Sequence, residues 1–263
     1  MKKYLVIGNP IKHSLSPKLH NFWFKNNNIN AIYEKKLIND DELEDLVLEI
    51  RKKNIHGVNV TVPFKRAVIP YLDHLSFESE TTQSVNTIYL DNNKIIGHNT
   101  DIEGFENSLK DSEFDVVDKK VFILGAGGVV PSIIFALNKM KVSEITISNR
   151  TKDKAVTLKN LFRNIKIVDW GEVPEFDMII NATSIGLEKN DKINLDIYGI
   201  GKNKCFYDII YKPDETNFLK NGKKLGNRTL NGKMMFLYQA LAAFNVWHGV
   251  QPKINDEVIR LLD

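Results

Sequence analysis

The chain of 263 residues has one cysteine, Cys205, which excludes an intramolecular disulfide and a cysteine-ligated metal cluster. It has no run of about 18 apolar residues, so no membrane-spanning helix is expected. The first residues also lack the apolar stretch of a signal peptide. The net charge of +3 gives no reason to expect a nucleic-acid partner. We therefore expect a cytoplasmic monomer or homodimer with a small-molecule substrate, no metal, no nucleic acid and no membrane partner.

The rest of the composition is that of an ordinary globular protein, with 43% hydrophobic and 26% charged residues. A chain of this length holds either one large domain or two ordinary ones. Cys205 lies in an apolar run, which favours a core position for it.

The segment from Lys119 to Thr151 has the pattern of a βαβ unit. A short apolar run, 121–124, is followed at once by Gly125-Ala126-Gly127-Gly128, and then by helical spacing over 129–140 and a β-branched run over 144–148. Gly125 allows a tight turn, and Gly127 allows the backbone to approach a pyrophosphate, which then lies on the helix N-terminus. The segment therefore predicts a dinucleotide site.

The glycine motif alone is weak, because its last position is Val130 where glycine or alanine is usual. Its place between a strand and a helix favours dinucleotide binding over a purely structural turn. An NAD site has an acidic residue about 20 residues after the glycines, whereas this chain has Asn149, Arg150 and Thr151 in that region. A guanidinium suits a 2′-phosphate, so we expect NADP; the alternative is that Arg150 is a solvated surface residue.

The N-terminal part predicts strands over 4–8 and 31–37 and helices over 17–26 and 40–53. Ser16 is interpreted as a helix N-cap, with Pro17 at the first helical position. That interpretation does not explain Ser14. Two hydroxyls beside a helix N-terminus also suit a carboxylate, and the two interpretations stay open.

The segment 56–63 alternates strictly. Val58, Val60 and Val62 are expected on one face of a strand, and Asn59 and Thr61 on the other, as in the wall of a polar cleft.

Lys65 follows this strand and is a candidate acid/base, although a lysine considered alone is usually solvated. Asp101 follows an expected hairpin of 85–90 and 94–98. As the N-cap of the next helix it needs no functional explanation, but as a carboxylate near Lys65 it would tune that lysine. Spacing does not decide between the two.

Several motifs together resemble those of the shikimate dehydrogenase family, in the family's order and over the whole chain. The most specific are His13-Ser14-Leu15-Ser16-Pro17 and Asn59-Val60-Thr61-Val62-Pro63-Phe64-Lys65. The others are 7–10, Val85-Asn86-Thr87, Gly97 with Asn99-Thr100-Asp101, 125–128 and 149–151.

The resemblance implies reversible reduction of 3-dehydroshikimate to shikimate by NADPH, with Lys65 and Asp101 as the catalytic pair. It implies that Ser14 and Ser16 hold the substrate carboxylate, supported by Thr61 and Tyr211, and that the ring hydroxyls are bound by Asn59, Asn86 and Gln239. Lys65 and Asp101 also count among the substrate-binding residues. The implied cofactor residues are Gly125, Ala126, Gly127, Gly128 and Val129 for the pyrophosphate, Asn149, Arg150, Thr151 and Lys154 for the 2′-phosphate ribose, and Ile209 and Gly232 for the nicotinamide.

The expected fold class is α/β in two domains. An N-terminal α/β substrate domain, 1–101 plus 236–263, is followed by a Rossmann-type doubly wound NADP-binding domain, 102–235. The apolar segment 234–247 and the segment 254–262 are expected to return and pack on the first domain.

Four residues depart from the family pattern: Ile102 stands where glycine is usual, Phe77 where many relatives are acidic, and Val129-Val130 is bulkier than usual. Two other functions stay open. One is a quinate/shikimate dehydrogenase with relaxed cofactor or substrate use, against which Arg150 argues if NAD is required. The other is a non-catalytic NADP-binding regulatory protein, against which Lys65 and Asp101 argue.

Overall fold

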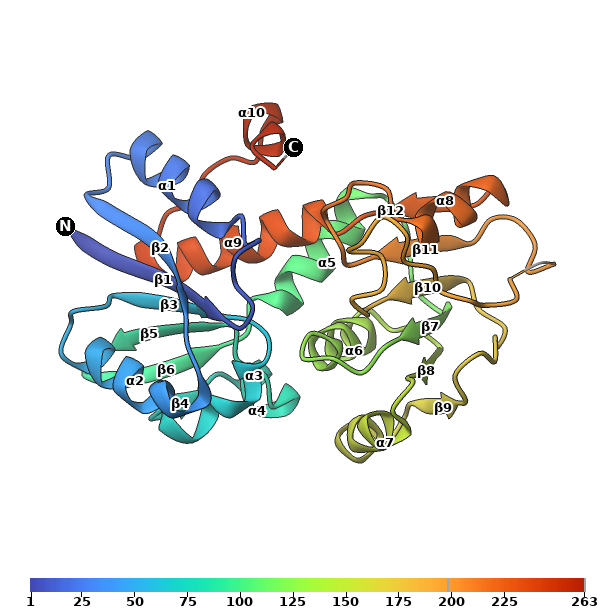
Figure 1. Cartoon of the computed structure of the whole chain (residues 1–263), viewed down its shortest axis with the longest axis horizontal. Coiled ribbons are helices and arrows are strands. Elements are labelled where there is room, and N and C mark those ends of the chain that lie inside the picture. Colours follow the sequence, from blue (N-terminus) through green and yellow to red (C-terminus); the bar gives the residue numbers. More distant parts are fainter. Residues whose placement is uncertain (198, 263) are drawn as a thin grey trace. The chain divides into compact units, whose positions relative to one another are not determined.

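The computed structural model describes residues 1–197 and 199–262 and divides into two compact units (Figure 1). Unit 1 consists of Met1–Gly104 and Leu237–Asp263, and unit 2 of Phe105–Phe236. Each unit contains one sheet covered by helices, which confirms the predicted α/β class. Two helices run from one unit into the other: α5 (Asp101–Asp111) and α9 (Lys233–His248).

Unit 1 is built on a mixed six-stranded sheet in the order β2-β1-β3-β5-β6-β4. Strand β1 is parallel to β2 and β3, while β5 is antiparallel to β3 and β6. The predicted hairpin is present, and Asn92 and Asn93 form its turn with φ of 46° and 64°, a conformation that asparagine tolerates. The strands are β1 Lys2–Gly8, β2 Ala31–Leu37, β3 Gly57–Val60, β4 His74–Leu75, β5 Thr87–Asp91 and β6 Lys94–His98.

The inner strand β1 is buried on both faces, as its continuous apolar run suggests. Leu5 and Ile7 belong to one cluster with the apolar face of α2, whereas Tyr4 packs against Phe24 of α1 and Trp247 of α9. The helices of this unit, besides the parts of α5 and α9, are α1 Ser16–Asn26, η1 Asp40–Glu42, α2 Leu43–Arg51, α3 Phe64–Ala67, η2 Ile69–Tyr71, α4 Phe77–Thr82 and α10 Asp256–Arg260.

The return of the C-terminal segment to the first part of the chain is confirmed. Trp247 donates a hydrogen bond from Nε1 to the carbonyl of Ile88 at 3.2 Å, and the ring of Phe244 lies 5.5 Å from that of Trp23.

Two local predictions in this unit are wrong. Helix α1 begins at Ser16 with Leu15 at the N-cap, and the Ser14 hydroxyl accepts a hydrogen bond from the Ser16 amide at 3.3 Å. Strand β3 ends at Val60 because the chain leaves the sheet over 61–63. Val62 is consequently 56% exposed and does not share the buried face of Val58 and Val60.

The core around α1 contains a buried histidine, His20, whose ring stacks on that of Tyr33 at 4.3 Å. Both ring nitrogens are buried without a hydrogen-bond partner among the described residues. Aromatic rings of Trp23, Phe244 and Trp247 surround it. Burial, and secondly the charge of His248, lowers the pKa of His20 to about 3.

Replacing His20 with phenylalanine is expected to weaken the pH dependence of stability. Since the folded-state pKa of His20 is lowered, the unfolded chain binds a proton first as the pH falls. The free energy of unfolding therefore decreases below about pH 6.5, by about 1.4 kcal/mol per pH unit. Relative to the variant, the native chain should lose about 2 kcal/mol between about pH 6.5 and pH 5, as measured by urea unfolding. Exposed His74→Phe is the control, and a native-minus-variant difference that is constant over this range would refute the prediction.

Unit 2 is built on an all-parallel sheet in the order β12-β11-β10-β7-β8-β9. The chain moves outwards from β7 through β8 to β9, then restarts at β10 on the other side of β7. This is the doubly wound order, with its reversal between β7 and β10. The elements are β7 Lys120–Leu124, α6 Val130–Lys139, β8 Glu144–Ser148, α7 Lys152–Leu161, β9 Lys166–Val168, β10 Met178–Asn181, β11 Cys205–Asp208, α8 Asn217–Lys224 and β12 Arg228–Leu230.

The core of unit 2 includes the buried residues Phe122, Phe176 and Phe206. Cys205 is fully buried, as predicted, and burial raises the pKa of its thiol to about 12. Among residues 1–197 and 199–262, no helix combines the length and apolar character that crossing a bilayer requires.

Candidate active site

The position of Lys65 follows from the end of β3. The Thr61 amide still bonds to the Ile7 carbonyl at 2.9 Å, and the Phe64 amide bonds to the Thr61 carbonyl at 2.9 Å, which starts α3. The Phe64 ring is buried in the core. Lys65 is therefore fixed at a tight corner and is only 8% exposed, so it is not an ordinary solvated lysine.

Lys65 forms a buried ion pair with Asp101, 36 positions along the chain. Nζ lies 2.5 Å from Oδ2, and the two side chains are 10% and 9% exposed. The other carboxylate oxygen of Asp101 accepts a hydrogen bond from Nδ2 of Asn86 at 2.9 Å. The amide of Asp101 itself bonds to Oδ1 of Asn99. The Asp101 carboxylate thus accepts hydrogen bonds from Lys65 and from Asn86. Of the two interpretations of Asp101, the structure agrees with the one that pairs it with Lys65.

Asn86 is held by two threonines. Its Oδ1 accepts from the Thr100 amide at 2.7 Å and from the Thr87 hydroxyl at 3.0 Å, while Nδ2 also donates to Oγ1 of Thr100 at 2.9 Å. Both threonines are fully buried. Asn86 therefore presents its amide nitrogen to Asp101 in a fixed orientation.

Asn59 and Tyr33 extend this network. Nδ2 of Asn59 donates to the Asn86 carbonyl at 3.1 Å and to the Thr87 hydroxyl at 3.0 Å, and Oδ1 accepts from the Tyr33 hydroxyl at 2.7 Å. Burial raises the pKa of Tyr33 well above its ordinary value, opposed by a hydrogen bond with Ser16, so the phenol stays a neutral donor.

The hydroxyls of Ser14 and Ser16 lie 3.3 Å apart. A continuous chain of hydrogen bonds starts at Tyr33 and joins four of the predicted site residues, Asn59, Asn86, Asp101 and Lys65, whereas Ser14 and Ser16 are hydrogen-bonded to each other.

Three members of this network, Tyr33, Thr87 and Thr100, had no predicted role. Thr87 and Thr100 lie inside the motifs that suggested the family, beside residues that received roles. Tyr33 is the only fully buried residue of β2, and a buried tyrosine hydroxyl usually has a partner. That signal was available, but the identity of the partner was not, because Asn59 lies on another strand.

The side-chain hydrogen bonds described above do not include the other three predicted substrate residues, Thr61, Gln239 and Tyr211. Thr61 is half-buried and lies beside Gly8: a Cβ atom on Gly8 would lie 2.6 Å from the methyl group of Thr61. Gln239 is half-buried on α9. Tyr211 belongs to unit 2, where its ring lies 4.6 Å from that of Phe236. The roles of these three residues stay predictions.

The predicted pyrophosphate turn follows β7. Gly125 has φ of +110°, and a Cβ there would lie 2.8 Å from the Ala182 carbonyl oxygen, so glycine is required. At Gly127 the nearest atom to such a Cβ is 3.9 Å away, which leaves room for a close ligand. Helix α6 starts just after, and its N-cap, Val129, supplies no side-chain hydrogen bond to the first turn. This arrangement fits a pyrophosphate on a helix N-terminus.

The two bulky residues at 129–130 differ in their burial. Val130 is fully buried in the core, and Val129 is half-buried. Of the other departures, Ile102 is also a core residue, whereas Phe77 is 70% exposed.

The predicted 2′-phosphate residues lie beside the glycine turn, because Leu124 and Ser148 are partners at the ends of β7 and β8. Asn149 closes the segment by donating from Nδ2 to the Thr151 carbonyl at 2.7 Å. Arg150 and Lys154 are exposed. Two cations at this edge fit an additional phosphate.

Ile209 and Gly232, predicted to line the nicotinamide, follow β11 and β12. A Cβ on Gly232 would overlap the Ile209 carbonyl oxygen, so only glycine fits. The Gly232 amide bonds to the Ile210 carbonyl at 3.0 Å. All predicted cofactor residues thus lie at the carboxyl edge of the sheet, where doubly wound folds bind their ligands.

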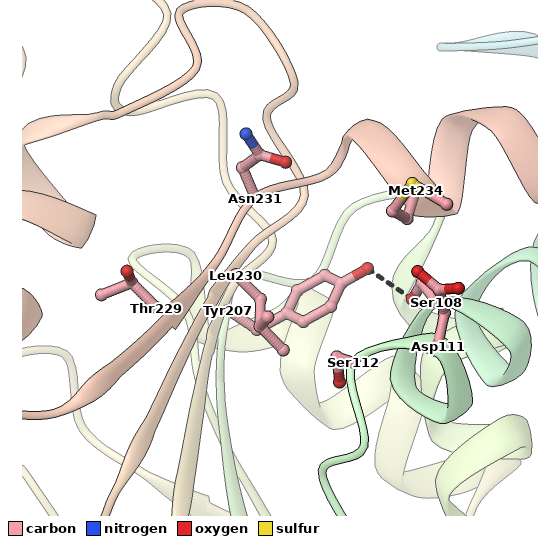
Figure 2. A pocket seen from close by; sticks show the side chains of 8 residues that line it. All are labelled: Ser108, Asp111, Ser112, Tyr207, Thr229, Leu230, Asn231 and Met234. Atoms are coloured by element: carbon pink, nitrogen blue, oxygen red, sulfur yellow. Dashed lines mark hydrogen bonds between the residues drawn. The ribbon is translucent and has the colours of Figure 1, made fainter. Parts of the chain in front are cut away.

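A separate cavity of about 290 Å³ in unit 2 is lined by α5, β11, β12 and the start of α9 (Figure 2). The Tyr207 and Ser108 hydroxyls are hydrogen-bonded to each other there at 2.8 Å. Its lining residues are Ser108, Asp111, Ser112, Tyr207, Thr229, Leu230, Asn231 and Met234. It contains none of the predicted cofactor residues. In the part of the chain that the structure describes, no cluster of three His, Cys, Asp or Glu is arranged to hold a metal.

Two family models match the chain. The first, described as shikimate dehydrogenase substrate binding domain, matches residues 6–88, and the second, described as shikimate / quinate 5-dehydrogenase, matches residues 108–189. A curated shikimate dehydrogenase (NADP(+)) of Pelagibacter ubique is 61% identical over 262 residues, covering 100% of this chain and 99% of the relative. The chain belongs to the shikimate dehydrogenase family.

Solved shikimate dehydrogenases have the same fold. The structure from Aquifex aeolicus has a TM-score of 0.90 at 36% identity, covering 100% of this chain and 97% of the other. That of the Thermus thermophilus shikimate 5-dehydrogenase, in complex with NADP(H) and shikimate, has a TM-score of 0.88 at 28% identity and covers 100% and 98%.

Proposed function

We propose that this chain catalyses the reversible reduction of 3-dehydroshikimate to shikimate with NADPH, in aromatic amino-acid biosynthesis. The observation that carries the proposal is the buried Lys65–Asp101 pair at 2.5 Å, joined by hydrogen bonds to Asn86 and Asn59. The relatives' name and the NADP(H) and shikimate in the Thermus thermophilus complex support the substrate and the cofactor.

NADPH supplies the hydride that reduces C3 of the substrate when it is bound. The chain's own part is the proton. Lys65 as an ammonium polarises the C3 carbonyl and donates a proton to its oxygen, and in the reverse direction the neutral amine takes the proton back. Asp101 holds the ammonium through one carboxylate oxygen and is itself held by Asn86 through the other.

The remaining substrate contacts are assigned by chemistry. Hydroxyl donors suit the substrate carboxylate, and amides, which both donate and accept, suit its ring hydroxyls. The proposed carboxylate residues are Ser14, Ser16, Thr61 and Tyr211, and the proposed ring-hydroxyl residues are Asn59, Asn86 and Gln239.

The cofactor residues are assigned along the carboxyl edge of the unit 2 sheet. The proposed sets are 125–129 for the pyrophosphate, Asn149, Arg150, Thr151 and Lys154 for the 2′-phosphate ribose, and Ile209 and Gly232 for the nicotinamide. We also propose that 1–101 with 236–263 binds substrate, that 102–235 binds NADP, and that the enzyme is cytoplasmic; monomer and homodimer both stay open.

The deciding experiment is a four-way assay of NADP and NAD with shikimate and quinate, followed through the absorbance of the reduced nicotinamide. We expect turnover with NADP and shikimate and much less with the other three combinations. Comparable rates with quinate or NAD would favour the relaxed quinate/shikimate alternative. NADP binding without turnover of either substrate would favour the non-catalytic alternative.

A further inference from the structure

A carboxylate that the proposed mechanism does not use, Asp208, is fully buried at the end of β11. Its Oδ1 accepts hydrogen bonds from Nδ2 of Asn181 at 3.1 Å and from the Ile210 amide at 3.0 Å, and its Oδ2 accepts from the Thr216 hydroxyl at 2.6 Å. Burial raises the pKa of Asp208, while these hydrogen bonds oppose that shift. The ion pairs found among the described residues do not include it, so uncharged donors hold this group.

Through Asn181, Asp208 shapes the loop after β10. Oδ1 of Asp208 accepts a hydrogen bond from the Ile210 amide, so this oxygen acts as an acceptor. The group of Asn181 that faces Oδ1 must therefore be its donor, the NH₂ group. Nδ2 of Asn181 also donates to the Ile185 carbonyl at 3.0 Å. Its Oδ1 accepts from the Thr183 amide at 3.1 Å and from the Thr183 hydroxyl at 2.7 Å. The orientation of one amide therefore determines the path of residues 182–185.

This loop packs on the glycine turn, because the Ala182 carbonyl oxygen lies 2.8 Å from the Cβ position of Gly125. The other two hydrogen bonds hold the segment after β11. The Ile210 amide is fixed directly, and the Ile210 carbonyl accepts from Gly232 at 3.0 Å. Thr216 is the N-cap of α8, where its hydroxyl also accepts from the Leu219 amide.

We propose that Asp208 is a positioning residue for the nicotinamide half of the NADP site. It acts through the backbone of 182–185 and 209–210 rather than by touching the cofactor. Asp208 joins the loop after β10, the residues directly after β11 and the N-cap of α8. The second of these segments contains Ile209, which is assigned to the nicotinamide. The 2′-phosphate ribose is assigned to residues after β8, which the hydrogen bonds of Asp208 do not reach. The inference rests on the proposed NADP-dependent function.

The test compares two ligands in the full chain. Asp208→Ala leaves three donors without their acceptor: the Asn181 amide group, the Ile210 backbone amide next to Ile209, and the Thr216 hydroxyl. We expect the Kd for NADPH, measured by calorimetry, to rise by about 10- to 100-fold. The Kd for adenosine 2′-phosphate, which lacks both the pyrophosphate and the nicotinamide half, should stay within about twofold of the native value. Asp208→Asn, which keeps one oxygen for Asn181 and Ile210, should restore most of the NADPH affinity.

Asp177→Ala is the matched control. Its carboxylate lies just before β10, at the amino edge of the same sheet, and accepts a hydrogen bond from the Lys120 amide at 2.9 Å. It should leave both dissociation constants unchanged. If Asp208→Ala does not fold, Thr216→Val removes one of the three donors and should still raise the Kd for NADPH selectively. Thr216→Ser keeps the hydroxyl and should restore the native Kd.

Two results would overturn the inference: an unchanged Kd for NADPH in folded Asp208→Ala, or an equal rise for both ligands, which indicates a general loss of structure. A native chain that binds neither ligand would instead overturn the proposed function, and this inference with it.

Discussion

Replacing Lys65 with alanine is expected to lower kcat by about 100- to 10,000-fold, the range that positioned acid/base groups contribute. The variant loses the only ammonium that is paired with Asp101 in the described residues, and with it the proposed proton donor for the C3 oxygen. The measurement is kcat at saturating shikimate and NADP. Because Lys65 is not assigned to the cofactor, the Kd for NADPH should change little.

Stability must be measured beside activity for this variant. Removing one partner of a buried ion pair leaves an uncompensated charge, which costs about 3–5 kcal/mol, although Asn86 still donates to Asp101. Lys65→Met, which keeps the aliphatic stem, separates lost chemistry from lost packing. Lys52→Ala, on an exposed lysine of the same unit, is the control. A near-native kcat in folded Lys65→Ala would remove this lysine from the mechanism.

Replacing Arg150 with aspartate is expected to raise the KM for NADP by about 100-fold and to leave the KM for NAD unchanged or lower. The change removes a guanidinium that suits the 2′-phosphate and adds a carboxylate that repels it. A carboxylate just after β8, where Arg150 lies, also suits the free 2′-hydroxyl of NAD. The measurement is the ratio of kcat/KM for the two cofactors with saturating shikimate.

Arg163→Asp makes the same charge change on an exposed arginine just after α7 and is the matched control. It should shift neither KM by more than about twofold, since exposed charges at a distance are screened by salt. If Arg150→Asp and Arg163→Asp had the same effect on NADP, the discrimination would come from net charge, and Arg150 would have no specific role.

The sequence predicted the Rossmann-type unit best, because its signals are local. The apolar run of β7, the glycine turn and the helix of α6 are contiguous, and parallel strands buried on both faces read as continuous apolar runs. The caps and strand ends were predicted less well. Ser16 was expected to cap α1 and instead begins it, because Ser14 two residues earlier supplies the hydroxyl.

The polar network was predicted in part. The motifs identified Lys65, Asp101, Asn59 and Asn86, but the residues that orient them were not assigned. The reason is geometric: the Tyr33 hydroxyl reaches Asn59 across 26 positions of the chain, and no local spacing encodes that contact. The carboxylate of Asp208 was missed similarly, because its donor Asn181 is 27 positions away on a neighbouring strand.

The discontinuity of unit 1 has a consequence for biosynthesis. Unit 2 is one uninterrupted stretch, Phe105–Phe236, whereas in unit 1 the aromatic residues Tyr4 and Trp23 pack against Trp247 and Phe244 of α9. During translation all residues of unit 2 are therefore synthesised before unit 1, whose N-terminal part is made first, has received the aromatic residues of α9. Until then Tyr4 and Trp23 lack their cover, and a nascent chain arrested before residue 237 should engage chaperones through this apolar surface.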